Sequence, residues 1–196
     1  LTIEVSKLQP WIDEFVPGAG KINSIEQFKG GQSNPTYKII TDSKDLVLRR
    51  KPPGKLLPSA HAVDREYKVI TALYETDVPV PKTYGLCEDD DIAGTTFFVM
   101  DFLDGDLFWD PMIPSVTNKD RTEIYQNKNK TLAKLHNVDY KKFGLQDYGK
   151  PGNYVARQVS RWSKQYRASE TDDIEAMNNL IEWLPKNIPD DDETSI

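Results

Sequence analysis

The sequence predicts an α+β protein made of two parts. Short apolar or alternating runs bounded by turn residues fill the first half, which is typical of an antiparallel sheet. One amphipathic segment, 63–74, interrupts these runs, and the second half carries only helical periodicity. A mainly antiparallel sheet with one main helix, followed by helices alone, indicates two lobes. We place the boundary where Asp104-Gly105-Asp106 turns the chain, which gives parts 1–103 and 104–196.

The elements of the first part follow from apolar spacing and turn residues. A short helix is expected at 5–16, and Ser59 is a candidate cap for the helix at 63–74. Asp89-Asp90-Asp91 is expected to form an acidic turn between the last two strands. The expected strands are 22–29, 37–41, 46–50, 82–88 and 95–103. The second part is expected to hold three helices, at about 120–137, 152–167 and 173–184.

Composition narrows the class of protein. A net charge of −6 and a pI of about 5.0 disfavour nonspecific nucleic-acid binding, which needs a basic surface. The single cysteine, Cys87, suits a reducing compartment and is expected to be a buried strand residue. No run approaches 18 apolar residues, so we expect no membrane span. No secretory signal is evident at the N-terminus. We expect an intracellular protein, in the cytoplasm or an organelle.

Glu66 is the most informative residue of the segment 63–74. It lies on the apolar face of the expected helix, beside Val63, Tyr67, Ile70 and Tyr74. A carboxylate directed at a core is costly unless a cation meets it.

Arg49, at the end of the preceding strand, is the candidate cation for Glu66, and the two are expected to form an ion pair. Arg50 should point to the opposite face of the strand. The alternative is that Arg49 and Arg50 only solvate an edge strand.

A glycine turn precedes this strand. Its residues are Gly30, Gly31, Gln32, Ser33 and Asn34. Backbone N–H groups of such a turn can bind phosphates, with Ser33 and Asn34 as donors at its tip; the alternative is an ordinary hairpin turn. Glycine turn, strand with a cation, and helix with an inward Glu are in the order typical of a kinase-type nucleotide site.

Longer stretches of the sequence extend this comparison to a family. They are Gly31-Gln32-Ser33-Asn34-Pro35-Thr36-Tyr37, Leu46-Val47-Leu48-Arg49-Arg50-Lys51-Pro52-Pro53-Gly54, Leu57-Pro58-Ser59-Ala60-His61, Val78-Pro79-Val80-Pro81 and Trp162-Ser163-Lys164-Gln165-Tyr166. The chain resembles the aminoglycoside phosphotransferase-like branch of the protein-kinase fold, and in particular the kinase-like N-terminal domain of multidomain acyl-CoA dehydrogenases.

The resemblance implies a function and its cofactors. It implies transfer of the γ-phosphoryl of ATP, with Mg, to a hydroxyl of a small metabolite such as a hydroxyacyl-CoA, and fusion to an acyl-CoA dehydrogenase domain. It also implies that Met100 to Leu103 form the hinge between lobes. The backbone of Asp101 and Leu103 would bind adenine, and the Met100 side chain would lie behind the base. The pattern of this run alone equally fits a simple buried strand.

The family's catalytic loop, His-Gly-Asp followed after four residues by Asn, has no counterpart in this sequence. The two histidines, His61 and His136, are followed by Ala62 and Asn137. We therefore expect no catalytic residue and no metal ligand in this chain, the Mg ligands in a missing C-terminal part, and no activity from the chain alone. The alternative function is a non-catalytic nucleotide-binding or docking module of a larger protein.

A basic stripe marks the second expected helix of the second part. Arg157, Arg161 and Lys164 are spaced i, i+4 and i+7 on its polar side. Such a stripe is either a solvated face or a wall for an anionic substrate.

Overall fold

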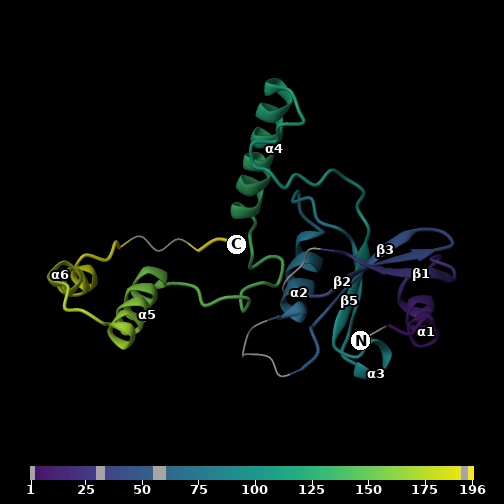
Figure 1. The fold of residues 1–196 in the computed structure, drawn as a ribbon, viewed down its shortest axis with the longest axis horizontal. Helices are drawn as coiled ribbons and strands as arrows, with labels where there is room; N and C mark the ends of the chain where they lie inside the picture. The colour runs from purple at the N-terminus through teal and green to yellow at the C-terminus, as the bar shows by residue number, and fades with distance from the viewer. Residues whose placement is uncertain (1–2, 30–33, 55–60, 191–193) are drawn as a thin grey trace. The chain divides into compact units, whose positions relative to one another are not determined.

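Five antiparallel strands form one sheet in the computed structural model, which describes residues 3–29, 34–54, 61–190 and 194–196 (Figure 1). The strands lie in the order β1-β2-β3-β5-β4, so β3 is central. Every strand predicted from the sequence is present within a few residues of its expected bounds. Those bounds are β1 (Ile22–Gln27), β2 (Thr36–Thr41), β3 (Asp45–Arg50), β4 (Thr83–Cys87) and β5 (Phe97–Asp101).

Two helices cover opposite faces of this sheet. α1 (Val5–Phe15) packs Trp11 against Phe97, with ring centroids 5.1 Å apart. α2 (Val63–Leu73) packs Tyr67 against Phe98, at 5.9 Å. Because neighbouring strand residues point to opposite faces, these contacts place α1 and α2 on different sides of β5 (Figure 1).

The main core lies on the α1 face. Leu46, Leu48 and Val99 from the sheet are fully buried there, together with Leu8 and Ile12 from α1. Gly85 lets β4 approach α1 closely, because a Cβ at this position would lie only 3.0 Å from the Trp11 ring. Arg49 and Glu66, the candidates for the nucleotide site, lie on the α2 face. The main core therefore stabilises the sheet from the side opposite to the candidate site.

Three local expectations differ from the structure. The residue at the N-cap of α2 is Ala62, with no side-chain cap, and Ser59 lies outside the described residues. Tyr74 is the C-cap of α2 and keeps a helical backbone, but its side chain is 47% exposed, so it does not extend the buried apolar face. The acidic turn is instead a one-turn helix, α3 (Asp90–Ala93). The Asp89 side chain caps it, and Gly94 ends it with a φ of 82°.

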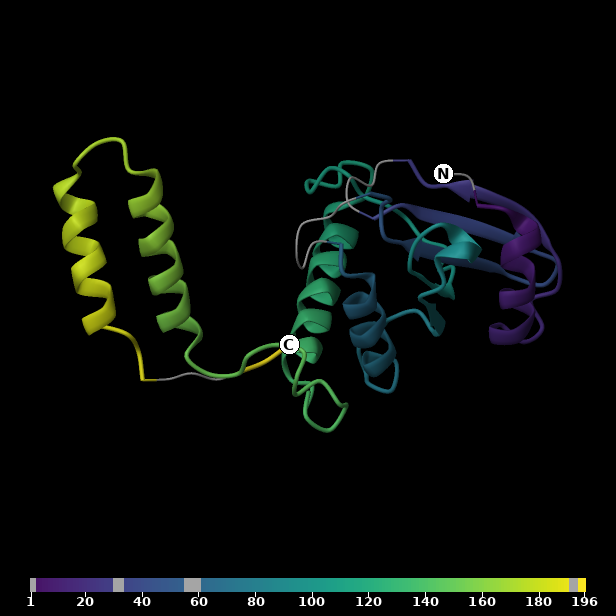
Figure 2. The ribbon, with the colours of Figure 1, turned by 90° about the horizontal axis from the view of Figure 1, so that it is seen from below.

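The second half of the described chain is helical, as predicted. It contains α4 (Asn118–His136), α5 (Tyr154–Ser169), α6 (Glu175–Trp183) and the 3-10 turn η1 (Leu184–Lys186). Figure 2 shows α5 and α6 side by side as a helical hairpin. Within the described residues, none of the helices is long and apolar enough to cross a membrane.

The chain divides into two compact units, Leu1–His136 and Asn137–Ile196. The first contains the sheet and α4, and the second contains α5 and α6. The lobe boundary expected near residue 104 stays a prediction.

Candidate nucleotide site

Arg49 of β3 and Glu66 of α2 form a bidentate ion pair, as predicted. The Arg49 Nε donates to Glu66 Oε2, and Nη2 donates to Oε1 at 3.2 Å. Both side chains are about one-third exposed, at 30% and 33%. Since β3 lies between β2 and β5, Arg49 is not on an edge strand, and that alternative is wrong. The pair holds the Arg49 cation on the α2 face of the sheet, where the guanidinium stays accessible to solvent.

Arg50 points to the opposite face, as strand alternation predicts. Its side chain is only 2% exposed, and its guanidinium donates to Tyr37 Oη at 2.8 Å and to the Ala93 carbonyl of α3. Its cation also lies 5.0 Å from the centre of the Tyr37 ring. Arg50 is therefore part of the structural core and not of the candidate site.

Thr36 contacts the Arg49–Glu66 pair directly and His61 contacts it through Asn34, and the sequence assigned neither residue to the nucleotide site. Thr36 Oγ1 accepts from Arg49 Nη1 at 2.9 Å and donates to the Asn34 carbonyl at 3.0 Å. His61 Nδ1 lies 3.0 Å from Asn34 Oδ1. Thr36 could have been found from the hairpin register, because it pairs directly with Arg49. His61 gave no such signal, because it is 27 residues from Asn34 in the sequence.

The glycine turn connects β1 with β2. Gly30, Gly31, Gln32 and Ser33 lie outside the described residues, so their contact with phosphates stays a prediction. Asn34, the last residue of the turn, is described and is only 5% exposed. Its side-chain amide is already used, because Nδ2 donates to Glu66 Oε1 at 2.8 Å and Oδ1 faces His61. The Asn34 side chain is therefore a partner of the ion pair and not a free donor at the loop tip.

The predicted hinge is held by side chains around Asp101. Tyr84 Oη donates to Asp101 Oδ1 at 2.5 Å and accepts from Lys44 Nζ at 3.1 Å. Burial raises the pKa of Tyr84 above its ordinary value, and the adjacent Asp101 raises it further. The Asp101 N–H donates to the Lys82 carbonyl at 2.9 Å. These contacts fix the strand end that leads into the hinge.

Leu103 and Met100 differ in their surroundings. Leu103 is 64% exposed, and its N–H has no partner among the described residues. Met100 is half-buried and, by alternation along β5, lies on the same face as Phe98 and Arg49. This arrangement is compatible with a Leu103 N–H that donates to a base and a Met100 side chain behind it. The binding of adenine there stays a prediction.

A ring contact that the sequence did not indicate joins the hinge to β1. Phe28, which follows β1, stacks on Phe102, with centroids 6.4 Å apart and planes 13° from parallel. The Lys38 ammonium lies 4.1 Å from the centre of the Phe102 ring. Phe28 directly follows β1, so this stack ties the end of β1 to the hinge.

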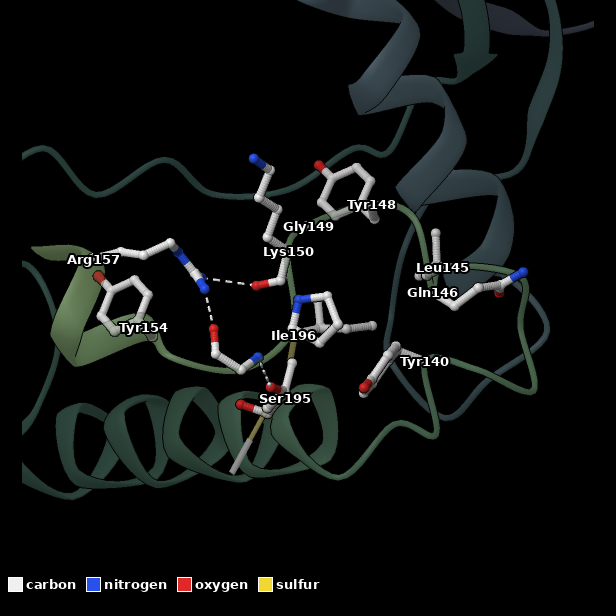
Figure 3. Close-up of a pocket in the computed structure, with 13 residues that line it drawn as sticks. Tyr140, Leu145, Gln146, Tyr148, Gly149, Lys150, Tyr154, Arg157, Ser195 and Ile196 are labelled. Atoms are coloured by element: carbon white, nitrogen blue, oxygen red, sulfur yellow. Dashed lines mark hydrogen bonds between the residues drawn. The ribbon is translucent and has the colours of Figure 1, made fainter. Parts of the chain in front are cut away.

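The basic stripe lies in the second unit and is described there by itself. Arg157, Arg161 and Lys164 line one shallow depression of about 490 Å³. The Arg157 guanidinium turns away toward the carbonyls of Lys150, at 2.8 Å, and Gly152 (Figure 3). Arg161 and Lys164 are exposed, which leaves them as the accessible cations of the stripe.

A cavity of about 500 Å³ lies beside Arg157 in the same unit. Three tyrosines, Tyr140, Tyr148 and Tyr154, contribute to its lining (Figure 3). The sequence did not indicate this cavity, because two of these tyrosines lie in turns and one begins a helix, without shared periodicity.

The described residues offer no ready metal site. Within them, no group of three or more His, Cys, Asp or Glu side chains could hold a metal ion.

The five-stranded sheet, followed by helices, and the Arg49–Glu66 ion pair are together typical of kinase-like phosphotransferases. The family model described as "Phosphotransferase enzyme family" (APH) matches residues 24–196. The chain therefore belongs to this phosphotransferase family.

Solved structures agree with this assignment. A crystal structure from Ralstonia eutropha, provisionally described as an aminoglycoside phosphotransferase, is 46% identical, with a TM-score of 0.81; the match covers 96% of this chain and 55% of that one. The GDP complex of aminoglycoside 2'-phosphotransferase-IIIa is 15% identical, with a TM-score of 0.59, and the match covers 94% and 59% of the two chains. At that identity the second match shows the fold alone.

The similar curated proteins are much longer than this chain. Acyl-CoA dehydrogenase family member 10 of Mus musculus is 46% identical over 87% of this chain and 16% of its own length. Acyl-CoA dehydrogenase family member 11 of Homo sapiens is 42% identical over 94% of this chain and 24% of its own length. The chain thus spans a quarter or less of these relatives, as the resemblance to a domain of a multidomain protein predicted.

Proposed function

We propose that this chain forms the nucleotide-binding lobe, residues 1–103, and the first part of the helical lobe, residues 104–196, of an ATP-dependent small-molecule phosphotransferase. The observation that carries the proposal is the bidentate pair of Arg49 with Glu66. Kinase-type sites hold a strand cation with a helix Glu so that the cation can bind phosphates. Family membership supports phosphoryl transfer as the reaction class.

Arg49 is suited to the role that lysine has in most kinases. A guanidinium can bind a carboxylate and a phosphate at the same time, because it carries five N–H donors in a fixed plane. The pair is about one-third exposed, so a phosphate can reach Arg49 without unfolding of the sheet. Binding and orienting the phosphates is the part of catalysis that these residues can supply.

ATP is the proposed phosphoryl donor, bound between the glycine turn and the hinge. A fold relative was solved as a streptomycin-ATP-APH(2")-IIa ternary complex, with 13% identity and a TM-score of 0.55. That complex supports the nucleotide class only through the shared fold. The proposed turn residues Gly30 to Ser33, the Asn34 N–H and the backbone of Asp101 and Leu103 would contact the nucleotide.

The proposed acceptor is a hydroxyl of an anionic metabolite, with a hydroxyacyl-CoA as the leading candidate. The acyl-CoA dehydrogenase names of the longer relatives support an acyl-CoA. Arg161 and Lys164, with Arg157 beside them, would attract the phosphates of coenzyme A. A fused acyl-CoA dehydrogenase domain would be the natural partner of such a kinase domain.

Magnesium is the expected cofactor of phosphoryl transfer, where it neutralises phosphate charge. The described residues do not form a site for it, so we assign no step of the reaction to a metal held by them. The base and the Mg ligands are proposed to lie in sequence outside this chain.

The test is ATP consumption by the full-length protein with Mg and a panel of hydroxyacyl-CoAs, free hydroxy acids and aminoglycosides. Mass spectrometry of the products should show one phosphoryl group added to the acceptor. The 196-residue chain alone, assayed in parallel, should show no turnover. Turnover by this chain near the full-length rate would show that the catalytic residues have been misplaced.

A negative result would favour a different function. ATP binding without turnover on any acceptor would support a nucleotide-binding or docking module. No ATP binding by the full-length protein would refute the nucleotide site itself.

A further inference from the structure

The side-chain amide of Asn34 lies between two groups that determine its orientation. On one side is the Glu66 carboxylate, paired with Arg49, which can only accept hydrogen bonds. Asn34 must therefore present Nδ2 to Glu66 and Oδ1 to His61, at 2.8 and 3.0 Å. Because Oδ1 can only accept, the His61 Nδ1 must carry a proton. The contacts thus require a proton on His61 Nδ1.

Asn34 is more buried than the ion pair it supports. Asn34 is 5% exposed, whereas the side chains of Arg49 and Glu66 are about one-third exposed. His61 adopts a left-handed backbone conformation, with φ at 58°, directly before the N-cap of α2. A buried amide that lost one of these partners would keep an unsatisfied polar group, so the arrangement resists rotation of the amide.

The same contacts account for most of the donors on Arg49. Its Nε and Nη2 bind Glu66, and its Nη1 binds Thr36. Among the residues that the structure describes, three of its five N–H groups are therefore used. Two remain for a phosphate, and their direction depends on how Glu66 is held. Asn34 sets that position directly, and His61 sets it through Asn34.

We propose that Asn34 and His61 are positioning residues that orient the Arg49–Glu66 pair for nucleotide phosphates. This inference rests on the proposed phosphotransferase function. It adds two residues whose effect on the nucleotide runs through Glu66.

The test uses substitutions that separate the two nitrogens of His61. An Asn amide nitrogen can take the place of Nδ1, and a Gln amide nitrogen can take the place of Nε2. In the full-length protein, His61→Asn should bind ATP within about twofold of wild type, and His61→Gln should weaken ATP binding on the order of tenfold, the change expected for one lost buried hydrogen bond. Asn34→Leu should weaken it at least as much. Adenosine affinity should be unchanged in all three variants, since adenosine carries no phosphate.

Asn23→Leu is the matched control. Asn23 also donates its amide to a carboxylate of the sheet region, that of Asp42 at 3.2 Å, but it is exposed. This variant should bind ATP and adenosine as wild type does. Equal ATP affinity for His61→Asn and His61→Gln, or an unchanged affinity for Asn34→Leu, would overturn the positioning role.

A second readout does not depend on nucleotide binding. The ring ¹⁵N shifts of His61, identified by their loss in His61→Gln, should report a proton on Nδ1 in the nucleotide-free full-length protein. A ring protonated only at Nε2 would overturn the inference even if ATP binds. Absence of ATP binding with a ring protonated at Nδ1 would instead refute the proposed function and leave the Asn34–His61 contact established.

Discussion

The sheet region and the helical region of this chain differ in how they bury their apolar side chains. The main core cluster contains only residues between Ile3 and Val99. In contrast, α4, α5 and α6 contain no buried residue, and Trp162, Leu180 and Trp183 are 59%, 44% and 55% exposed. The predicted nucleotide residues are thus held by a packed core, whereas the predicted acceptor residues lie on lightly packed helices. The geometry of the first site is therefore intrinsic to the sheet region.

The largest expected effect compares one leucine from each region. Leu48→Ala, in the fully buried centre of the sheet, should lower the free energy of unfolding by about 2–5 kcal/mol. Leu180→Ala, on α6, should lower it by roughly 1 kcal/mol or less, because Leu180 is already 44% exposed. Chemical denaturation followed by tryptophan fluorescence measures both. Equal losses would show that the helices are as tightly packed as the sheet.

The next comparison is between the two neighbouring arginines of β3. Arg50→Met should cost about 2–3 kcal/mol, because Tyr37 Oη and the Ala93 carbonyl would lose their donor inside the core. Arg49→Met should cost about 1 kcal/mol or less, because its ion pair is partly in water. Thermal and denaturant unfolding of both variants provide the measurement. A larger loss for Arg49 would mean that the ion pair, and not Arg50, holds the sheet together.

Much of this contrast could be predicted from the sequence. Period-two alternation located β3 and separated Arg49 from Arg50, and helical periodicity placed Glu66 on the inner side of α2. Local patterns carry this information because side-chain direction repeats along a strand or helix. The Arg49–Glu66 contact followed from the cost of directing a carboxylate at a core without a cation.

Other features could not be predicted because they depend on distant or subtle contacts. Asn34 meets Glu66 across 32 residues, and no periodicity links them. The acidic run became α3 because the Asp89 side chain caps it and Gly94 accepts a left-handed conformation, which a reading of charge alone overlooks. Tyr74 continues the apolar spacing of α2, but at the C-terminus of the helix its side chain is 47% exposed.

The acceptor site can be tested against the nucleotide site. In the full-length enzyme, Arg161→Glu should raise the acceptor KM on the order of tenfold, about 1.4 kcal/mol, and leave the ATP KM unchanged. Lys130→Glu, on exposed α4, is the charge-reversal control and should change neither constant. Equal effects of Arg161→Glu on both substrates, or none on either, would make the stripe a solvated face.

The smallest effect concerns the hinge. Burial and Asp101 raise the pKa of Tyr84 in the folded chain, so the unfolded chain releases this proton first as pH rises above about 10. Stability should therefore fall more steeply above about pH 10 in wild type than in Tyr84→Phe, by up to about 1.4 kcal/mol per pH unit. Unfolding free energies measured across this range for both proteins test this. Parallel curves would show that Tyr84 is ordinarily solvated.

The most direct test of the nucleotide site is calorimetric titration of ATP and adenosine into the full-length protein and its Arg49→Met variant. Arg65→Met, at an exposed position of the same helix as Glu66, serves as the control. We expect Arg49→Met to weaken ATP binding at least about tenfold, as for a lost charge-assisted phosphate contact, and to leave adenosine binding unchanged. The Arg65→Met protein should bind both ligands as wild type does. ATP affinity that is the same in wild type and Arg49→Met would contradict the assignment of this pair to nucleotide phosphates.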